Sequence, residues 1–319
     1  MAGFHLPFHP VRSALYDPLE LLEGFNAQDP HSFAATVDFH IFQYFKAAVK
    51  DPAGRYLTGM LEALHDNSML QGMSAFLDER RCIAIMGGHK VDRASPTYTD
   101  VAGLAWNLTR AGYLVATGGG PGVMEAGHLG ALMSAGGQDV LGDAIKRLAS
   151  APSMPENIRN ILDSHGHPKW HIVAEAHAWA KPAIEIFESV HNPGVSLAIP
   201  TWLYGHEPFT PFATHIAKFF QNSIREDGLL SIANHGIVYA EGAAGTLQEV
   251  FQDANQNFYE TLGCFSPMVF LGCEQWAERY PVETILRPLF GDERYDRYVR
   301  VTDSVDEAAG FLMSGPPGL

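Results

Sequence analysis

Two glycine-rich segments, and the carboxylates beside them, are the parts of this chain best suited to chemistry. The first reads GGGPGVMEA at residues 118–126, and the second reads EGAAGTLQE at residues 241–249. Each follows a short apolar run, at residues 113–116 and 236–240, and precedes a stretch that suits a helix. Glycine lets the backbone approach an anion, and the N–H groups and positive dipole end of the following helix attract it. The pattern therefore predicts two phosphate-binding turns.

Glu249 is the acidic side chain best placed to act on a ligand held by the second turn. It lies three residues after Thr246, about one helical turn, and so faces the mouth of the expected pocket. A carboxylate there can stabilise a positive charge that develops on a bound ligand or activate water for attack. The alternative is a capping box, in which Thr246 caps the helix and Glu249 reaches back to its N–H.

Neither segment has a common nucleotide signature, because the first lacks the third glycine of G-x-G-x-x-G and the second lacks the P-loop lysine. Together they resemble the LOG-type family, misnamed as lysine decarboxylases, whose members carry GGGxxGxM and PGGxGTxxE turns on a Rossmann-like sheet. The resemblance covers residues 80–136 and 195–275. The matching residues are Gly118, Gly119, Gly120, Gly122 and Met124 in the first turn and Gly242, Gly245, Thr246 and Glu249 in the second.

The resemblance implies a hydrolase that cleaves the N-glycosidic bond of nucleoside 5′-monophosphates, releasing free base and ribose 5-phosphate. Family substrates are cytokinin riboside monophosphates or ordinary AMP-, GMP- and CMP-type nucleotides, and the long chain favours the second type. No cofactor and no metal are required, and lysine decarboxylation is disfavoured because no lysine has a pyridoxal-phosphate context. The implied phosphate- and nucleotide-binding residues are Gly87, Gly88, Gly118, Gly119, Gly120, Gly122, Met124, Glu125, Gly242, Ala243, Ala244, Gly245 and Thr246.

Arg225 is the second catalytic candidate that the resemblance implies. It precedes Glu249 by 24 residues, and family members have an arginine near this offset that faces the glutamate across the active site. A guanidinium presents a fixed fork of donors to phosphate or ribose oxygens and keeps its charge at neutral pH. The family commonly has lysine next, whereas Glu226 follows here, so Lys218 is a rival. The alternative is a surface ion pair with Glu226 or Asp227.

Two positions of the second turn depart from the family pattern. Glu241 stands where proline is usual, and a carboxylate beside a phosphate is unfavourable unless it points away or meets a cation. Ala243 replaces a glycine and needs a backbone angle that alanine tolerates. These departures keep a second hypothesis open, in which the protein is a non-catalytic nucleotide sensor or carrier.

Other polar residues have two interpretations each. His89 follows a predicted strand and either contacts a base or phosphate or is a plain loop histidine. Glu125 either binds a ribose hydroxyl or stabilises the helix dipole. Four histidines without a zinc-type carboxylate or cysteine spacing lie close together in the sequence, and we expect no metal site there: His165, His167, His171 and His177.

The elements around the turns alternate between strand and helix, which predicts an α/β fold with a doubly wound, mostly parallel Rossmann-like sheet. Strands are expected at residues 82–86, 113–116, 195–199, 236–240 and 268–271. Helices are expected at residues 18–25, 32–49, 53–66, 95–110, 121–134, 139–149, 174–190, 212–220, 274–286 and 304–313, with another from the second turn to residue 259. We divide the chain into an N-terminal helical extension (1–80), a Rossmann-like domain (81–290) with a helical insertion (about 138–194), and a C-terminal tail (291–319).

Composition limits the partners and the compartment. The chain has 319 residues, of which 46% are hydrophobic and 18% charged, as in globular enzymes. A net charge of −15 argues against binding to nucleic acid or an anionic membrane. Residues 1–12 lack signal-peptide features, and three cysteines without C-x-x-C spacing fit a reducing compartment, so we expect a cytoplasmic protein. The apolar helices before residue 80 would cover a sheet edge or a partner subunit, and we expect a homodimer or larger homo-oligomer, as in the family.

Overall fold

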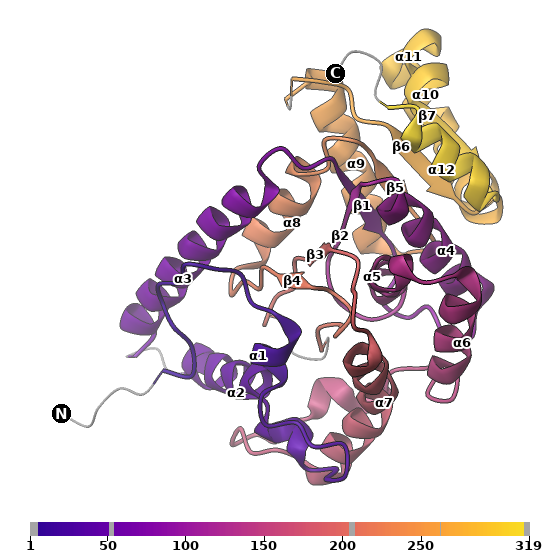
Figure 1. The fold of residues 1–319 in the computed structure, drawn as a ribbon. Coiled ribbons are helices and arrows are strands. Elements are labelled where there is room, and N and C mark those ends of the chain that lie inside the picture. The colour runs from indigo at the N-terminus through magenta and orange to yellow at the C-terminus, as the bar shows by residue number, and fades with distance from the viewer. Residues whose placement is uncertain (1–5, 51–53, 204–207, 262, 316–319) are drawn as a thin grey trace.

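The computed structural model describes residues 6–50, 54–203, 208–261 and 263–315. In this part of the chain, a seven-stranded sheet lies between layers of helices (Figure 1). All neighbouring strands are parallel, in the spatial order β4-β3-β2-β1-β5-β6-β7. The strands are β1 (Cys82–Met86), β2 (Leu114–Thr117), β3 (Ser196–Ala198), β4 (His215–Ile216), β5 (Ile237–Tyr239), β6 (Met268–Leu271) and β7 (Val299–Thr302). The predicted doubly wound, parallel, Rossmann-like fold is confirmed.

Both faces of the sheet are buried, which explains why its central strands are continuous apolar runs. Ile83 and Ile85 of β1 face one helical layer, whereas Ala84 and Met86 face the other. The first layer contains α4 (Pro96–Arg110), α5 (Val123–Leu132), α6 (Gln138–Leu148) and α12 (Val305–Met313). The second contains α2 (Val37–Lys50), α3 (Arg55–Leu77), α8 (Asn222–Ser231), α9 (Ala244–Tyr259) and α10 (Glu283–Phe290).

Helix α4 begins where its sequence predicts. The Ser95 side chain caps it by accepting a hydrogen bond from the Tyr98 N–H at 3.2 Å, and Pro96 occupies the first turn, where its missing N–H costs nothing. This helix is buried along one side against α5. Its cap fixes the loop that leaves β1, and this loop reaches the candidate site.

The N-terminal extension covers the β4 edge of the sheet. Tyr16, just before α1 (Pro18–Leu22), forms an antiparallel bridge with Ile216, with N–O distances of 3.0 and 2.8 Å. Residues 32–49, expected as one helix, form a 3₁₀ turn (Ser32–Ala35) and then α2. Helix α3 continues to Leu77, beyond its expected end at residue 66, and residues 51–53 lie outside the described chain. Edge covering, one of the two expected roles, is confirmed.

The insertion is helical, as expected. It contains α6, a 3₁₀ helix (Glu156–Asn160) and α7 (Trp170–Ser189). In Figure 1, α7 lies beside the first turns of the N-terminal extension, at one end of the molecule. The extension and the insertion therefore support each other at some distance from the sheet.

The helix predicted at residues 212–220 is wrong. This segment contains strand β4, and Phe219 forms a further parallel bridge with Thr201. Phe212 packs into one helical layer, whereas Ile216 and Phe220 pack into the other. Because both sides of the segment are buried, its apolar residues imitate the spacing of an amphipathic helix. Helix α8, which follows directly, was not predicted.

The helix predicted at residues 274–286 is also wrong as a single element. A π-helix (Glu274–Arg279) is followed by a break at residues 280–282 and then by α10. Beyond residue 291, α12 matches the expected helix, but α11 (Asp292–Tyr298) and β7 were missed. Strand β7 pairs with β6, so this part of the chain completes the sheet. No helix among the described residues is long and apolar enough to cross a membrane.

Candidate functional site

The candidate site lies where the strand order reverses, between β1 and β5. The chain winds outward in opposite directions from these two strands, and such a switch point is the usual ligand site of open α/β sheets. Three loops meet here. The Gly88 N–H donates to the Glu241 carbonyl at 2.7 Å, and the Val123 N–H donates to the Gly88 carbonyl at 3.1 Å. The loop after β1 thus ties the two glycine turns together.

Glycines are needed at this junction because the backbones are so close. Gly122 has a φ of +69°, and a Cβ there would collide with the Gly88 carbonyl. A Cβ on Gly87 would lie 2.5 Å from the Val123 side chain, and one on Gly88 would lie 3.3 Å from the Glu241 carbonyl. These residues therefore have a packing role in addition to any contact with a ligand.

The first turn is buried, and hydrogen bonds to neighbouring residues hold its backbone in place. Gly118, Gly119, Gly120 and Gly122 are all buried, and the Thr210 N–H donates to the Gly119 carbonyl at 2.8 Å. The Gly119 N–H donates to Thr117 Oγ1 at 2.9 Å. The Thr117 hydroxyl also meets His128, whose ring contacts the Ser196 hydroxyl at 2.9 Å. Burial lowers the pKa of His128 to about 3, so this polar network is uncharged at neutral pH.

The second turn is open to solvent. Ala243, Ala244 and Gly245 are exposed, and α9 begins at Ala244. Within the described residues, the N–H groups of Ala244, Gly245 and Thr246 have no acceptor, as at most helix starts. A helix N-terminus with unused donors is suited to holding an anion. The second turn therefore offers exposed helix donors that an anion can reach.

Both departures from the family pattern are accommodated in the structure. Ala243 has φ −124° and ψ −147°, so the turn does not hold it at a positive φ, where glycine would be favoured. The Glu241 carboxylate accepts a hydrogen bond from the Thr97 hydroxyl of α4 at 3.2 Å. Gly242 must remain glycine, since a Cβ would collide with the Thr246 side chain, and its N–H donates to Gln275 Oε1 at 3.3 Å.

Arg225 and Glu249 come together from two helices. Arg225 Nη1 of α8 lies 3.9 Å from Glu249 Oε1 of α9, and the side chains are 14% and 19% exposed. The same Nη1 atom lies 3.6 Å from the position of a Cβ built on Gly118, so the arginine lies between the first turn and Glu249. Arg225 Nε is buried and has no partner among the described residues. The partly exposed pair is thus reachable, whereas Nε is closed to solvent.

The contacts expected from the alternative interpretations of Arg225 and Glu249, a surface ion pair and a capping box, are not formed among the described residues. Glu226 accepts a hydrogen bond from Asn222 and Asp227 accepts one from Gln252, so neither acid pairs with Arg225. Lys218 is buried and pairs with Asp38 at 2.6 Å. Helix α9 has no side-chain hydrogen bond at its N-cap, so the capping box is not formed.

The electrostatic surroundings of Glu249 suit proton transfer. Burial raises the pKa of Glu249 to about 7, because it outweighs the opposing effect of the Arg225 charge, and Glu226 raises the pKa further. A carboxyl group with this pKa is partly protonated and partly ionised at neutral pH. It can therefore act as a general acid or as a general base under ordinary conditions.

Asp253 is a second perturbed carboxyl group, which the sequence analysis missed. It lies one turn after Glu249 on α9, is 2% exposed, and receives a 2.7 Å hydrogen bond from the Tyr239 hydroxyl. Burial raises the pKa of Asp253 to about 7, against the lowering effect of that hydrogen bond. The spacing of four residues from Glu249 was the available signal.

Glu125 fastens the insertion to the first turn. Its two carboxylate oxygens each accept a 2.7 Å hydrogen bond from Arg93, and the Tyr98 hydroxyl donates a third at 3.0 Å. Arg93 also donates to the carbonyls of Ala151 and Trp179 in the insertion. Glu125 is fully buried, so its carboxylate is not free to bind a ribose hydroxyl.

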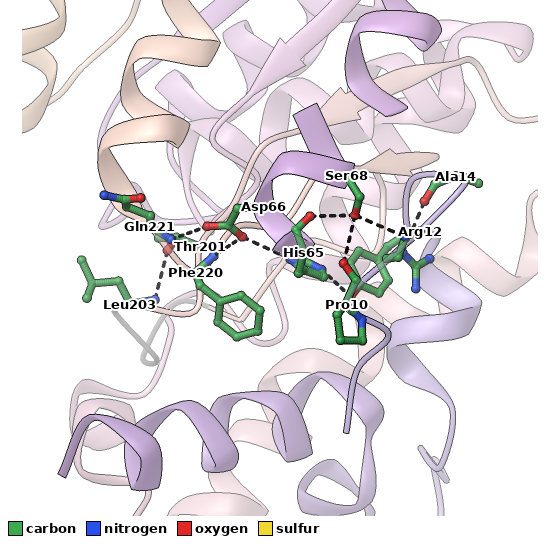
Figure 2. Close-up of polar contacts among 11 residues, drawn as sticks. Pro10, Arg12, Ala14, His65, Asp66, Ser68, Thr201, Leu203, Phe220 and Gln221 are labelled. Atoms are coloured by element: carbon green, nitrogen blue, oxygen red, sulfur yellow. Dashed lines mark hydrogen bonds and ion pairs between the residues drawn. The ribbon is translucent and has the colours of Figure 1, made fainter. Parts of the chain in front are cut away.

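The N-terminal extension holds the start of the helix that carries Arg225. The two carboxylate oxygens of Asp66 accept hydrogen bonds from the N–H groups of Phe220 and Gln221, at 3.0 and 2.9 Å, just before α8 (Figure 2). His65 Nδ1 contacts the same carboxylate at 3.1 Å, and its Nε2 meets the Tyr16 hydroxyl at 2.8 Å. All three side chains are buried. Asp66 therefore supports α8, although it lies far from Arg225 in the sequence.

The histidines of the insertion do not form one cluster. The ring of His177 stacks on Phe25 and meets the Asn26 carbonyl, whereas the N–H groups of His165 and His167 bind Asp163 in an exposed turn. Among the described residues, no three His, Cys, Asp or Glu side chains are arranged to hold a metal ion.

Comparison with known proteins adds no identification. No protein-family model matches the chain, and no curated protein matches it significantly. The arrangement of the site is therefore the basis for a functional assignment.

Proposed function

We propose that the protein is a hydrolase that cleaves the N-glycosidic bond of nucleoside 5′-monophosphates. The observation that carries this proposal is the Arg225–Glu249 pair, which is partly exposed and lies next to the first glycine turn. The open second turn, on the same helix as Glu249, is the natural place for the 5′-phosphate. The resemblance of both turns to the LOG-type family supports the same substrate class.

In the proposed reaction, the N–H groups of Ala244, Gly245 and Thr246 bind the phosphate. Arg225 contacts a ribose or phosphate oxygen through its partly exposed guanidinium. The bond between C1′ and the base nitrogen breaks as the C1′–oxygen bond to water forms. Ionised Glu249 stabilises the developing ribosyl cation and takes a proton from the water, while the base leaves with a proton from solvent. The products are free base and ribose 5-phosphate, and no cofactor enters this scheme.

The test is product release from AMP, GMP, CMP and a cytokinin riboside monophosphate. We expect release of free base and ribose 5-phosphate by the wild type and a decrease of about 10²–10⁴-fold in Glu249→Gln. Glu241→Gln is the matched control, because it removes a charge from the same turn at a carboxylate held by Thr97. Equal rates in wild type and Glu249→Gln would contradict the assignment of Glu249.

The alternative is a sensor or carrier that binds the same nucleotides without cleaving them. This alternative rests on the departures at Glu241 and Ala243, although Ala243 has a negative φ and the Glu241 carboxylate is held by Thr97. Tight binding of AMP without release of adenine would favour this alternative. The cytoplasmic location stays a prediction, and so does the expected homo-oligomer. For the oligomer, the relevant observation is that helix α3 exposes the apolar side chains of Tyr56, Met60 and Leu64 at four-residue spacing.

A further inference from the structure

A second cleft lies on the insertion side of the first glycine turn. Its volume is about 430 Å³, within the range of small-molecule sites. Gly122 and Glu125 of the first turn contribute to one part of its lining, and Arg159 and Trp179 of the insertion contribute to another. Arg225, Glu249 and residues 242–246 are not part of this lining. The cleft therefore lacks the groups proposed to act in hydrolysis, although it shares Gly122 and Glu125 with the first turn.

The charged side chains of the cleft favour an anion. Lys90 and Arg159 both line it, and neither forms an ion pair with any described residue. Arg93 is paired with Glu125, and the other acids nearby are Glu156 of the lining and Asp92, which accepts a hydrogen bond from the lining residue Ser153. Two cations without ion-pair partners thus gather here, in a chain with a net charge of −15. The N-terminal end of α5, with its positive dipole end, lies at the same place.

Trp179 forms part of the wall of the cleft. The side chain is 7% exposed, and its Nε1 is closed to solvent, so the indole N–H does not reach the open space of the cleft. The Arg93 guanidinium lies 4.1 Å from the centre of the Trp179 ring and covers one face. That face cannot stack on a base, so the lining favours recognition of charged oxygens over recognition of an aromatic group.

We propose that this cleft binds the phosphate group of a small phosphorylated molecule, as a second site beside the one at Glu249. Lys90 supplies one cation from the loop after β1, and Arg159 supplies the other from the insertion. The insertion thereby has a binding role of its own. The Arg93–Glu125 pair and Gly122 join the lining of the cleft to the first turn.

The test is calorimetric titration of the full chain with ribose 5-phosphate and with inorganic phosphate at low ionic strength. Neither probe has an N-glycosidic bond to hydrolyse. We expect two sites in the wild type. The double variant Lys90→Gln/Arg159→Gln should weaken one of them at least about tenfold, through loss of charge-assisted hydrogen bonds. Gly245→Glu should weaken the other, because it places a carboxylate in the second turn where a Cβ meets open space.

A matched control removes two positive charges elsewhere, with Lys146→Gln/Arg294→Gln at exposed positions. It should keep both sites. Two sites with unchanged affinity in the Lys90→Gln/Arg159→Gln variant would overturn the proposal. The proposal is also overturned if the wild type has one site and only Gly245→Glu weakens binding to it. If the wild type has one site and only Lys90→Gln/Arg159→Gln weakens binding to it, phosphate binding in the cleft is supported and the phosphate role of the second turn is contradicted. A wild type that binds neither probe contradicts both.

Discussion

The two glycine turns have similar sequences but different surroundings. The first is buried, packs against the loop after β1, and is supported by Thr117 and His128. The second is exposed and leaves helix N–H groups without acceptors. Their carboxylates differ in the same way, since Glu125 is locked to Arg93 whereas Glu249 is partly exposed with a pKa raised to about 7. Two glycine-rich turns of similar sequence can thus differ in burial and in the helix donors that they expose.

The largest effect on stability is expected for the first turn's carboxylate. Glu125→Gln removes the partner of a buried guanidinium and should lower the free energy of unfolding by about 3–5 kcal/mol. Chemical denaturation of the variant and the wild type measures this. A change below about 1 kcal/mol, the usual size for an exposed pair, would contradict the structural role of Glu125.

The second turn's carboxylate should have the opposite effect on stability, and only at higher pH. The pKa of Glu249 rises from 4.5 to about 7 on folding, so ionisation of the folded protein is disfavoured. The stability of the wild type relative to Glu249→Gln should therefore decrease between pH 4.5 and pH 7 and stay constant above. The total change is about 3 kcal/mol, by 1.36 kcal/mol per pKa unit. Unfolding curves of both proteins at pH 4 and pH 8 measure the difference, and a pH-independent difference would contradict the raised pKa.

Replacement of a glycine by alanine should change the free energy of unfolding by less than the carboxylate variants do, and by more in the first turn than in the second. Gly122→Ala forces alanine to a φ of +69° and against the Gly88 carbonyl, so we expect a loss of about 1–3 kcal/mol from backbone strain alone. The unfolding midpoint in denaturant measures it. An unchanged midpoint would show that the loop after β1 can move away from the turn.

The smallest effect is expected at Gly245, the counterpart in the open turn. A Cβ there meets nothing within 4 Å, and the residue lies in the first turn of α9. Gly245→Ala should therefore keep or raise stability, by up to about 1 kcal/mol. The same denaturation experiment serves, and a loss as large as that of Gly122→Ala would remove the distinction between the turns.

The central part of the fold could be predicted from the sequence because its signals are local. Apolar runs such as residues 82–86 and 268–271 identify buried strands, and the Ser95-Pro96 pair identifies a helix start. Strand β4 could not be predicted, since its apolar pattern arises from layers on both sides. Strand β7 is short, with the partly exposed residues Arg300 and Val301 between buried ends, and only pairing with β6 makes it a strand.

The candidate site was predictable to a similar degree. Glu249 and the turn around Gly242 follow from local spacing, and Arg225 came from the resemblance. The roles of Asp66, Arg93 and Glu125 depend on contacts between segments that are distant in the sequence. Asp66, for instance, binds an N–H group 154 residues away. Such pairings leave no periodic signal in a single sequence.

The bridge between Tyr16 and Ile216 has a consequence for how the protein behaves in a crowded solution. Strand β4 is at the edge of the sheet, and an open edge is a template on which another chain can add a strand. Tyr16 occupies the hydrogen-bonding positions of Ile216 from within the same molecule. The N-terminal segment thus blocks the addition of a strand from another chain at this edge. A proteolytic cut between Tyr16 and α1 would free the edge of β4 and favour aggregation there.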